Sequence, residues 1–171
     1  MGKTIWVSSG AKGGNGSQDS PYSSIQDAID DAKPGDVVMV KEGEYKENLD
    51  FPRGGTKDEP ITLMSADGPG KAVIKPKDED DSTIQIDGID NIKIDGFEIH
   101  GGEDDTPPAV HIHSVDNKKN PATNIEIVNN TIYRGNGDGI KVSKSSDVVI
   151  KNNKIEGGGS KESGIDVVGG E

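Results

Sequence analysis

Polar side chains that could do chemistry alternate with aliphatic residues in four short segments of this chain. The step of two between Ile140 and Val142 is strand periodicity, and it predicts that the intervening Lys141 points to solvent. Aligning the four segments on their aliphatic pairs gives one outward set, which comprises Gln85, His111, Lys141 and Asp166. If the segments are stacked strands, we expect these side chains to be neighbours about 4.8 Å apart.

Lys141 is the first candidate for a general base in this set. A lysine can act as a base only if its pKa falls toward the operating pH. Asp166 beside Lys141 would instead stabilise the ammonium group and raise its pKa. An exposed ion pair is therefore the favoured interpretation of the two residues, with a catalytic base as the alternative.

His111 and His113 place two imidazoles on one side of a strand, a geometry that can hold zinc or copper. A third ligand would have to be a carboxylate such as Asp87, because His100 belongs to another face of the repeat. A zinc site needs three or four convergent ligands, so surface histidines without a metal are the favoured interpretation.

Carboxylates could supply oxygen ligands for calcium. The candidate ligands are Asp138, Glu162 and Asp166, and two acidic loops, 78–81 and 103–105, offer further donors. None of them has the fixed spacing of a dedicated calcium loop, and acidic runs in loops are commonly just solvated.

A repeat along the second half of the chain indicates how these residues are positioned. Aliphatic triplets recur with steps of two and then five, at 92/94/99, 125/127/132 and 148/150/155, interleaved with apolar pairs at 84/86, 110/112, 140/142 and 165/167. Self-similarity at 20–30 residues is typical of solenoids, and steps of two indicate strands. We therefore predict an all-β fold, a right-handed parallel β-helix of about six coils.

The first part of the chain predicts an end cap. Residues 4–7 form a short strand, and Ser23 and Gln26 have the spacing of a capping box for an amphipathic helix that ends before Pro34. The helix would cover the open end of the core. We expect one domain over 1–171, with the strand and capping helix in 1–36 and the coils in 37–171.

Connections between the coils are also predictable. Strands are expected at 37–40, 61–64 and 72–74, a projecting loop at 51–60 and an inserted loop at 114–123. The pairs Asn129/Asn130 and Asn152/Asn153 fall at matching positions, where stacked amides could bond along the coils. The register places Ile165 and Val167 in a coil without a second face. We therefore expect a chain truncated at its C-terminus, and self-association through the open coil.

Composition narrows the function. The 171 residues are 29% hydrophobic with 24 glycines, which suits coils that bury few aliphatics and turn often. The net charge of −12 argues against nucleic-acid binding, and no apolar run is long enough for a membrane span. Without cysteine there is neither a disulfide nor a thiolate metal site, and Met1-Gly2-Lys3 lacks the apolar core of a signal peptide.

The opening of the chain resembles the N-terminal region of pectate-lyase-like β-helix proteins, notably polysaccharide lyase families nine and six. The resemblance covers residues 5–74 and rests on IWVSSGAKGGNGSQDSPYSSIQDAIDDAKPGDVVMVKEGEY and PITLMSADGPGKAVI. It implies a secreted protein that cleaves acidic polysaccharide by β-elimination, with calcium neutralising the uronate carboxylate and a lysine as base.

The resemblance also implies roles for particular residues. The context IKVSKS makes Lys144 a second candidate base beside Lys141, and GNGDGI makes Asp138 a calcium ligand, with Asp166 and Glu162 nearby. Gln85, His111 and His113 would bind substrate. The arginine that family six places one coil later is missing from SGIDVVGGE. The competing interpretation is a non-catalytic carbohydrate-binding or structural solenoid, such as a fragment or an engineered unit.

Overall fold

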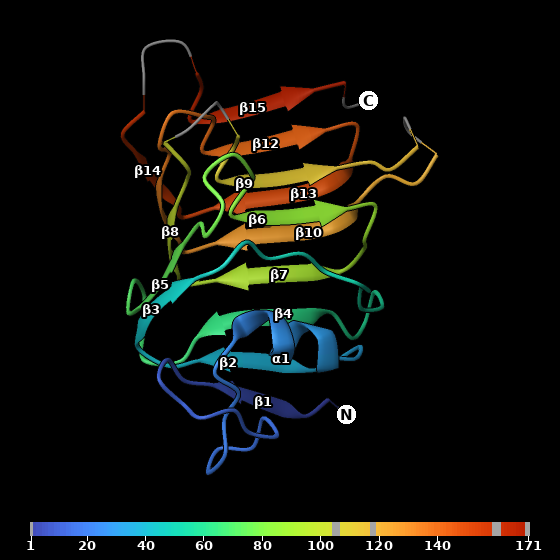
Figure 1. Ribbon diagram of the computed structural model, residues 1–171. Coiled ribbons are helices and arrows are strands. Elements are labelled where there is room, and N and C mark those ends of the chain that lie inside the picture. Colours follow the sequence, from blue (N-terminus) through green and yellow to red (C-terminus); the bar gives the residue numbers. More distant parts are fainter. Residues whose placement is uncertain (1, 104–106, 117–118, 159–161, 170–171) are drawn as a thin grey trace.

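The computed structural model describes residues 2–103, 107–116, 119–158 and 162–169. Figure 1 shows a chain that winds into stacked coils, with the two termini at opposite ends of the stack. The coils contribute strands to three sheets, and every strand pair within these sheets is parallel. The predicted right-handed parallel β-helix is confirmed.

The three sheets differ in their number of strands. Sheet A has six described strands, sheet B five and sheet C four, against the expectation of about six coils. Sheet A consists of β1 (Thr4–Val7), β2 (Val37–Val40), β4 (Ile61–Ser65), β7 (Ile92–Asp95), β10 (Thr123–Val128) and β13 (Ser146–Lys151). Sheet B consists of β3 (Gly43–Lys46), β5 (Ala72–Lys75), β8 (Glu98–His100), β11 (Thr131–Tyr133) and β14 (Lys154–Glu156). Sheet C consists of β6 (Ile84–Asp87), β9 (Val110–His113), β12 (Ile140–Ser143) and β15 (Ile165–Val168).

Inward aliphatic side chains form continuous vertical rows. In sheet A, Ile92 pairs with Ile61 on one side and Ile125 on the other, and all three are buried. Ile99 lies in sheet B, so the recurring step of five spans the corner between two sheets. Burying each such side chain stabilises the fold by roughly 1.5–3 kcal/mol, which explains how few aliphatics per coil suffice.

The predicted asparagine ladder is present at the corner between sheets A and B. Asn129 and Asn152 have φ values of 59° and 56°, in the left-handed region that asparagine tolerates. Nδ2 of Asn152 donates to Oδ1 of Asn129, and Nδ2 of Asn129 donates to Oδ1 of Asp95 in the coil before. The inner residue Asn130 bonds to Oδ1 of Asn153 through its backbone N and its Nδ2. The ladder therefore joins three successive coils.

The end cap is α1 (Ile25–Asp31), which packs on β1 and β2. Its inward residues Ile25, Ala28 and Ile29 are buried in the core. The predicted capping box was wrong by one residue: the N-cap is Ser24, whose hydroxyl accepts a bond from the backbone N of Asp27. The apolar stripe is compatible with either start, so only the cap geometry distinguishes them.

The loop over residues 51–60 does not project as predicted. Phe51 is buried, and Arg53 donates to the backbone oxygen of Ala32 beside the end of α1. Gly55 donates its N–H to the oxygen of Asp90 in the next coil. The loop therefore lies along the stack, because its backbone groups find partners there.

The inserted loop after β9 is confirmed, although residues 117–118 lie outside the described part. An antiparallel bridge between Val115 and Asn120 closes it, and Figure 1 shows it extending from the stack. Of the two acidic loops, 78–81 is described, whereas 104–105 of the other are not.

The last described strand, β15, exposes apolar side chains. Ile165 and Val167 pair with Ile140 and Val142, which are buried. Ile165 is nevertheless 45% exposed and Val167 64% exposed. The predicted self-association at this end stays a prediction.

Candidate functional site

The outward face of sheet C assembles the polar residues that the repeat singled out. Gln85 pairs with His111, His111 with Lys141, and Lys141 with Asp166, so the four form one row across successive coils. A second row alongside it comprises Asp87, His113, Ser143 and Val168. In-register parallel stacking thus brings together side chains up to three coils apart, as predicted.

An open depression of about 440 Å³ lies over these rows. It is lined by His111, His113, Ser114, Lys141, Ser143, Lys144 and Val168. Four of the eight predicted site residues therefore share one hollow: both lysines and both histidines. Ser143, two residues after Lys141, was not among the predicted site residues, although strand alternation places it on the same outward side.

Lys141 is held as a cation by two carboxylates. Its Nζ lies 3.3 Å from Oδ2 of Asp166 and 3.6 Å from Oδ2 of Asp138. Partial burial lowers the pKa of Lys141, but the hydrogen bonds and charges of Asp166 and Asp138 outweigh it and raise the pKa overall. Lys141 is therefore suited to binding an anion and poorly suited to accepting a proton.

Lys144 follows β12 in a left-handed conformation, with a φ of 51°. Its backbone N–H donates to the oxygen of Val168, which fixes this corner to the next coil. Lys144 lines the depression but lies outside the row of Lys141. The two candidate bases thus reach the same hollow from different positions on the coil.

The two histidines form a stacked pair. Their ring centroids are 4.4 Å apart, and Nε2 of His113 lies 2.6 Å from Oδ1 of Asp87. Burial lowers the pKa of His111 to about 4, helped by the positive charges of His113 and Lys141. His111 is therefore neutral near pH 7. Burial also raises the pKa of Asp87, against the opposing effect of His113.

The candidate calcium ligands are only partly brought together. Asp138 is buried, and its Oδ1 accepts a bond from the backbone N of Ser163. Its other oxygen and that of Asp166 already face the Lys141 ammonium group. Glu162 contacts this region through its backbone oxygen, which accepts a bond from Arg134.

No cluster of three or more histidine, aspartate or glutamate side chains suited to a metal ion occurs among the described residues. A calcium ion between Asp138 and Asp166 would have to displace Lys141, and the zinc alternative at His111 and His113 lacks a third converging ligand there. Calcium binding therefore stays a prediction, and no catalytic step is derived from it.

Gln85 is in the predicted row but not in the depression. Its Nε2 donates to Oδ1 of Asp81, so the side chain turns toward the acidic loop before β6. This leaves Lys141 and His111 as the centre of the sheet C surface.

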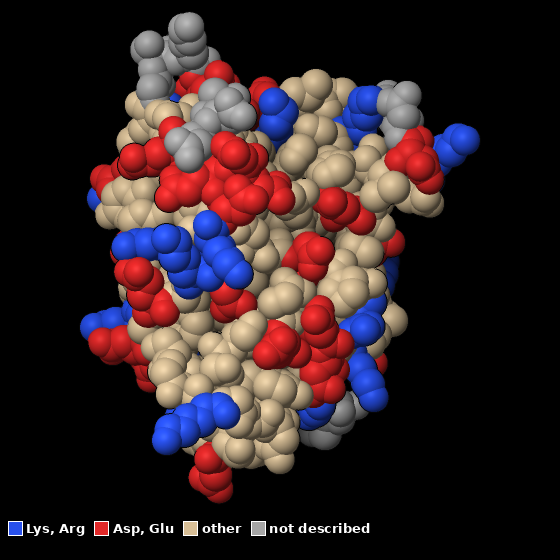
Figure 2. All heavy atoms as spheres, viewed as in Figure 1, with Lys and Arg blue, Asp and Glu red and all other residues tan. Residues whose placement is uncertain are grey.

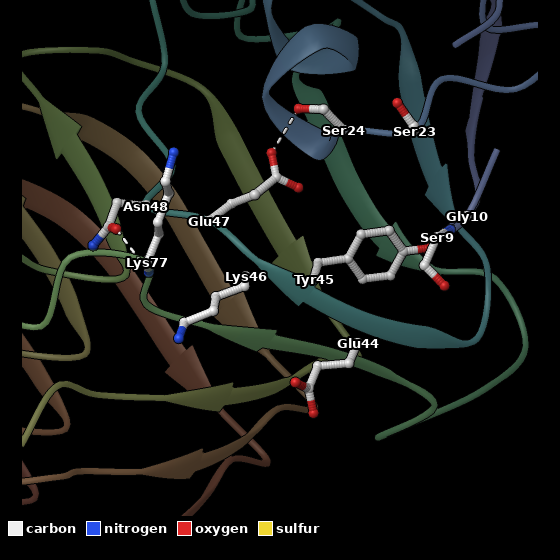
Figure 3. A pocket seen from close by; sticks show the side chains of 10 residues that line it. All are labelled: Ser9, Gly10, Ser23, Ser24, Glu44, Tyr45, Lys46, Glu47, Asn48 and Lys77. Atoms are coloured by element: carbon white, nitrogen blue, oxygen red, sulfur yellow. Dashed lines mark hydrogen bonds between the residues drawn. The ribbon is translucent and has the colours of Figure 1, made fainter. Parts of the chain in front are cut away.

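A second pair of hollows was not predicted from the sequence. They lie over sheet B, and one of them, of about 460 Å³, is drawn in Figure 3. Its lining comes from three separated segments: residues 9–10, 23–24 and 44–48, with Lys77. In the sequence, two charged residues flank the apolar Tyr45 at Glu44 and Lys46. This alternation is typical of a strand with one outward face, and it is the sequence signal for the surface over β3.

Comparisons with known proteins agree with this architecture. The family described as "Pel9A-like, right handed beta helix region" matches residues 5–162. The uncharacterized protein YwoF of Bacillus subtilis (strain 168) is 27% identical over 158 residues, which are 91% of this chain and 29% of YwoF. The chain thus spans less than a third of that relative.

Solved structures share the fold at low sequence identity. An alginate lyase from Paenibacillus sp. str. FPU-7 superposes with a TM-score of 0.58 at 20% identity, over 90% of this chain and 58% of the lyase. Pectate lyase Pel9A superposes with a TM-score of 0.55 at 17% identity, over 91% of this chain and 46% of that enzyme. A rhamnogalacturonan lyase superposes with a TM-score of 0.55 at 16% identity, over 99% of this chain and 51% of that enzyme.

Proposed function

Because this chain belongs to the family of Pel9A-like right-handed β-helix proteins, we propose that it binds acidic polysaccharide across the outward face of sheet C. The observation that carries the proposal is the row of His111 and Lys141, in register within one open depression. Such a row follows the axis of the coils and so offers an extended polymer one contact per coil.

The chemistry of the row suits a uronate. The Lys141 ammonium group can bind a sugar carboxylate, which would compete with Asp166 for the same charge. Neutral His111 and the hydroxyl of Ser143, 3.4 Å from its Nε2, can bond to sugar hydroxyl groups. Both kinds of contact are available within the one depression.

Cleavage by β-elimination is the second candidate function, favoured by the presence of Lys144 in the same depression. Lys141 would neutralise the sugar carboxylate. Lys144 in its amine form would remove the proton from the ring carbon that carries this carboxylate. The electron pair of that C–H bond would form a double bond as the glycosidic oxygen leaves and takes a proton from solvent. This arrangement assigns the two candidate lysines different roles.

Titration calorimetry with galacturonate and alginate oligomers tests binding. We expect Lys141→Gln to weaken binding at least tenfold, and Lys151→Gln, which removes an exposed lysine from sheet A, to leave it unchanged. Equal affinity of the two variants would overturn the proposal. Ultraviolet absorbance of unsaturated uronate, followed with and without calcium, tests elimination, and Lys144→Gln should abolish any signal.

A polymeric acidic substrate also leads us to propose an extracellular location. The described residues include no helix with the length and hydrophobicity that a membrane crossing requires. Recovery of the protein with the cell fraction, and its absence from the medium, would contradict this location.

A further inference from the structure

The outward face of sheet B carries a second row of side chains, on a different side of the coils from the sheet C row. Lys46 pairs with Lys75, and Tyr133 pairs with His100. Ile74 pairs with Ile99, which places His100 beside Lys75 in the next coil. The row therefore runs Lys46, Lys75, His100, Tyr133, and spans about 14 Å at the usual strand spacing.

Two depressions adjoin along this row. One has a volume of about 460 Å³ and the other about 350 Å³, and both are lined by Glu44 and Lys46. Together they form a trough over β3, β5 and β8, which we call the sheet B trough. Figure 3 shows Lys46 and Lys77 at one end of the first depression and Ser9 and Ser23 at the other.

The carboxylates that line the sheet B trough are mostly engaged already. Glu44 pairs with Lys75 at 2.7 Å. The oxygens of Glu47 accept bonds from the hydroxyl of Ser24 and from the first backbone N–H groups of α1. Glu79 accepts from the backbone N of Glu103, and of the lining carboxylates in the described part only that of Glu103 has no such partner.

The lysines show the opposite pattern. Within the described part of the chain, the ammonium groups of Lys46 and Lys77 make neither an ion pair nor a hydrogen bond. Figure 2 shows basic side chains gathered on the flank of the molecule beside β5, although the chain carries a net charge of −12. Two cations that are unpaired within the described residues and lie at the edge of a hollow can bind an anion.

The far end of the row offers a different contact. The His100 and Tyr133 rings stack with centroids 4.8 Å apart and an interplanar angle of 27°. Stacked rings present a flat, partly apolar surface with a polar edge, which can support a sugar ring. Nε2 of His100 lies 2.6 Å from Oε1 of Glu98, which fixes the orientation of the imidazole.

We propose that the sheet B trough is a second binding site for a uronate-containing oligosaccharide, with Lys46 and Lys77 on a carboxylate and the His100–Tyr133 stack under a sugar ring. This inference rests on the proposed function only for the class of polymer. Its residues share no side chain with the depression over sheet C. One chain could then hold two segments of polymer on two faces, which raises the avidity for long chains.

Titration calorimetry with a galacturonate hexamer tests the second site. We expect two binding events per wild-type chain, one lost in the double variant Lys46→Gln, Lys77→Gln and the other lost in Lys141→Gln. The matched control is Lys57→Gln, Lys151→Gln, which makes the same change of charge at two exposed lysines outside both depressions and should keep both events. Tyr133→Ala should weaken the sheet B event at least fivefold, and a neutral maltohexaose should not bind.

The outcomes separate the two proposals. Loss of all binding in Lys141→Gln, or identical titrations for the sheet B variant and its control, would overturn the second site and leave the sheet C proposal standing. Loss of all binding in the sheet B variant would overturn the sheet C proposal instead. A wild-type chain that binds no hexamer would overturn both.

Discussion

The Lys141 ammonium group lies 3.3 Å from the carboxylate of Asp166, one coil further along the chain. The pair is partly exposed, so it contributes roughly 0–1 kcal/mol to stability. Its main effect is on the state of the lysine, which remains charged and available to an incoming anion. The same carboxylate competes with that anion, and the competition makes the site adjustable by a single substitution.

Asp166→Asn should therefore strengthen binding of a galacturonate hexamer while barely changing stability. We expect a gain of up to about fivefold, the equivalent of an exposed ion pair worth up to about 1 kcal/mol. Calorimetry measures the gain, and Asp58→Asn, at an exposed position in the loop after Phe51, is the control for net charge. Weaker binding by Asp166→Asn would mean that Asp166 itself contacts the sugar.

The stability of the protein should depend on pH through His111. Its pKa of about 4 in the folded chain lies below the value of about 6.5 expected after unfolding. The unfolded chain then binds more protons, so this contribution is complete above about pH 6.5 and is lost as the pH falls toward 4. Because His111 is only partly buried, solvent screening limits the loss to about 2 kcal/mol. Urea unfolding from about pH 3 to about pH 7.5, which spans both pKa values, should show that the unfolding free energy depends less steeply on pH in His111→Gln than in the wild type.

Calcium should raise the melting temperature if Asp138 and Asp166 bind it. A site with a millimolar dissociation constant gains about 1.4 kcal/mol at tenfold excess, or about 3–6 °C for a chain of this size. The gain should vanish on chelation and increase in Lys141→Met, where the competing ammonium group is gone. Identical melting curves with and without calcium in both proteins would refute the predicted site.

Asn130 should be the most sensitive member of the asparagine ladder. It is buried, its Oδ1 accepts from the backbone N of Phe97, and its Nδ2 donates to the oxygen of Ile94. Asn130→Ala leaves those groups without partners and should cost about 2–4 kcal/mol of unfolding free energy. Asn129→Gly keeps a residue suited to positive φ at an exposed position of the ladder, and should cost less than about 1 kcal/mol. Urea unfolding compares the two variants, and equal costs would contradict the assigned difference.

The exposed apolar side chains of β15 should drive reversible self-association. Val167 and Ile165 expose inward-type side chains that a further layer would cover. Sedimentation velocity should show an average mass that rises with concentration, and Val167→Asp should hold the protein as a monomer. A wild-type chain that stays monomeric at high concentration would contradict this prediction.

The fold could be predicted from the sequence because the inward rows are almost purely aliphatic. Positions such as Ile92 and Ile125 carry the period directly, and the period fixes which outward residues are neighbours. β3 was not predicted, because Tyr45 is its one apolar inward residue and its burial depends on bonds with Ser9 and Lys41. The bond with Ser9 joins two distant segments and leaves no local signal.

The sheet C site could be predicted only where it follows from the strand register. The pairing of Lys141 with Asp166 follows from the register, whereas the approach of Asp138 depends on how the corner before β12 bends. The turn of Gln85 toward Asp81 is likewise a property of a loop. The repeat relates His100 to Tyr133 at one end of the sheet B row. It does not relate residues 9–10, 23–24 and 44–48, so no spacing rule could reveal the hollow that they line.

The segment between β9 and β10 leaves the stack and returns without disturbing the pairing on either side. A scaffold of this kind separates vertical order, which the strands maintain, from the lengths of the corners, which are free to vary. Evolution can therefore extend one corner into a long loop beside a binding face while the neighbouring coils keep their alignment. New specificity can be acquired in this way without a new fold.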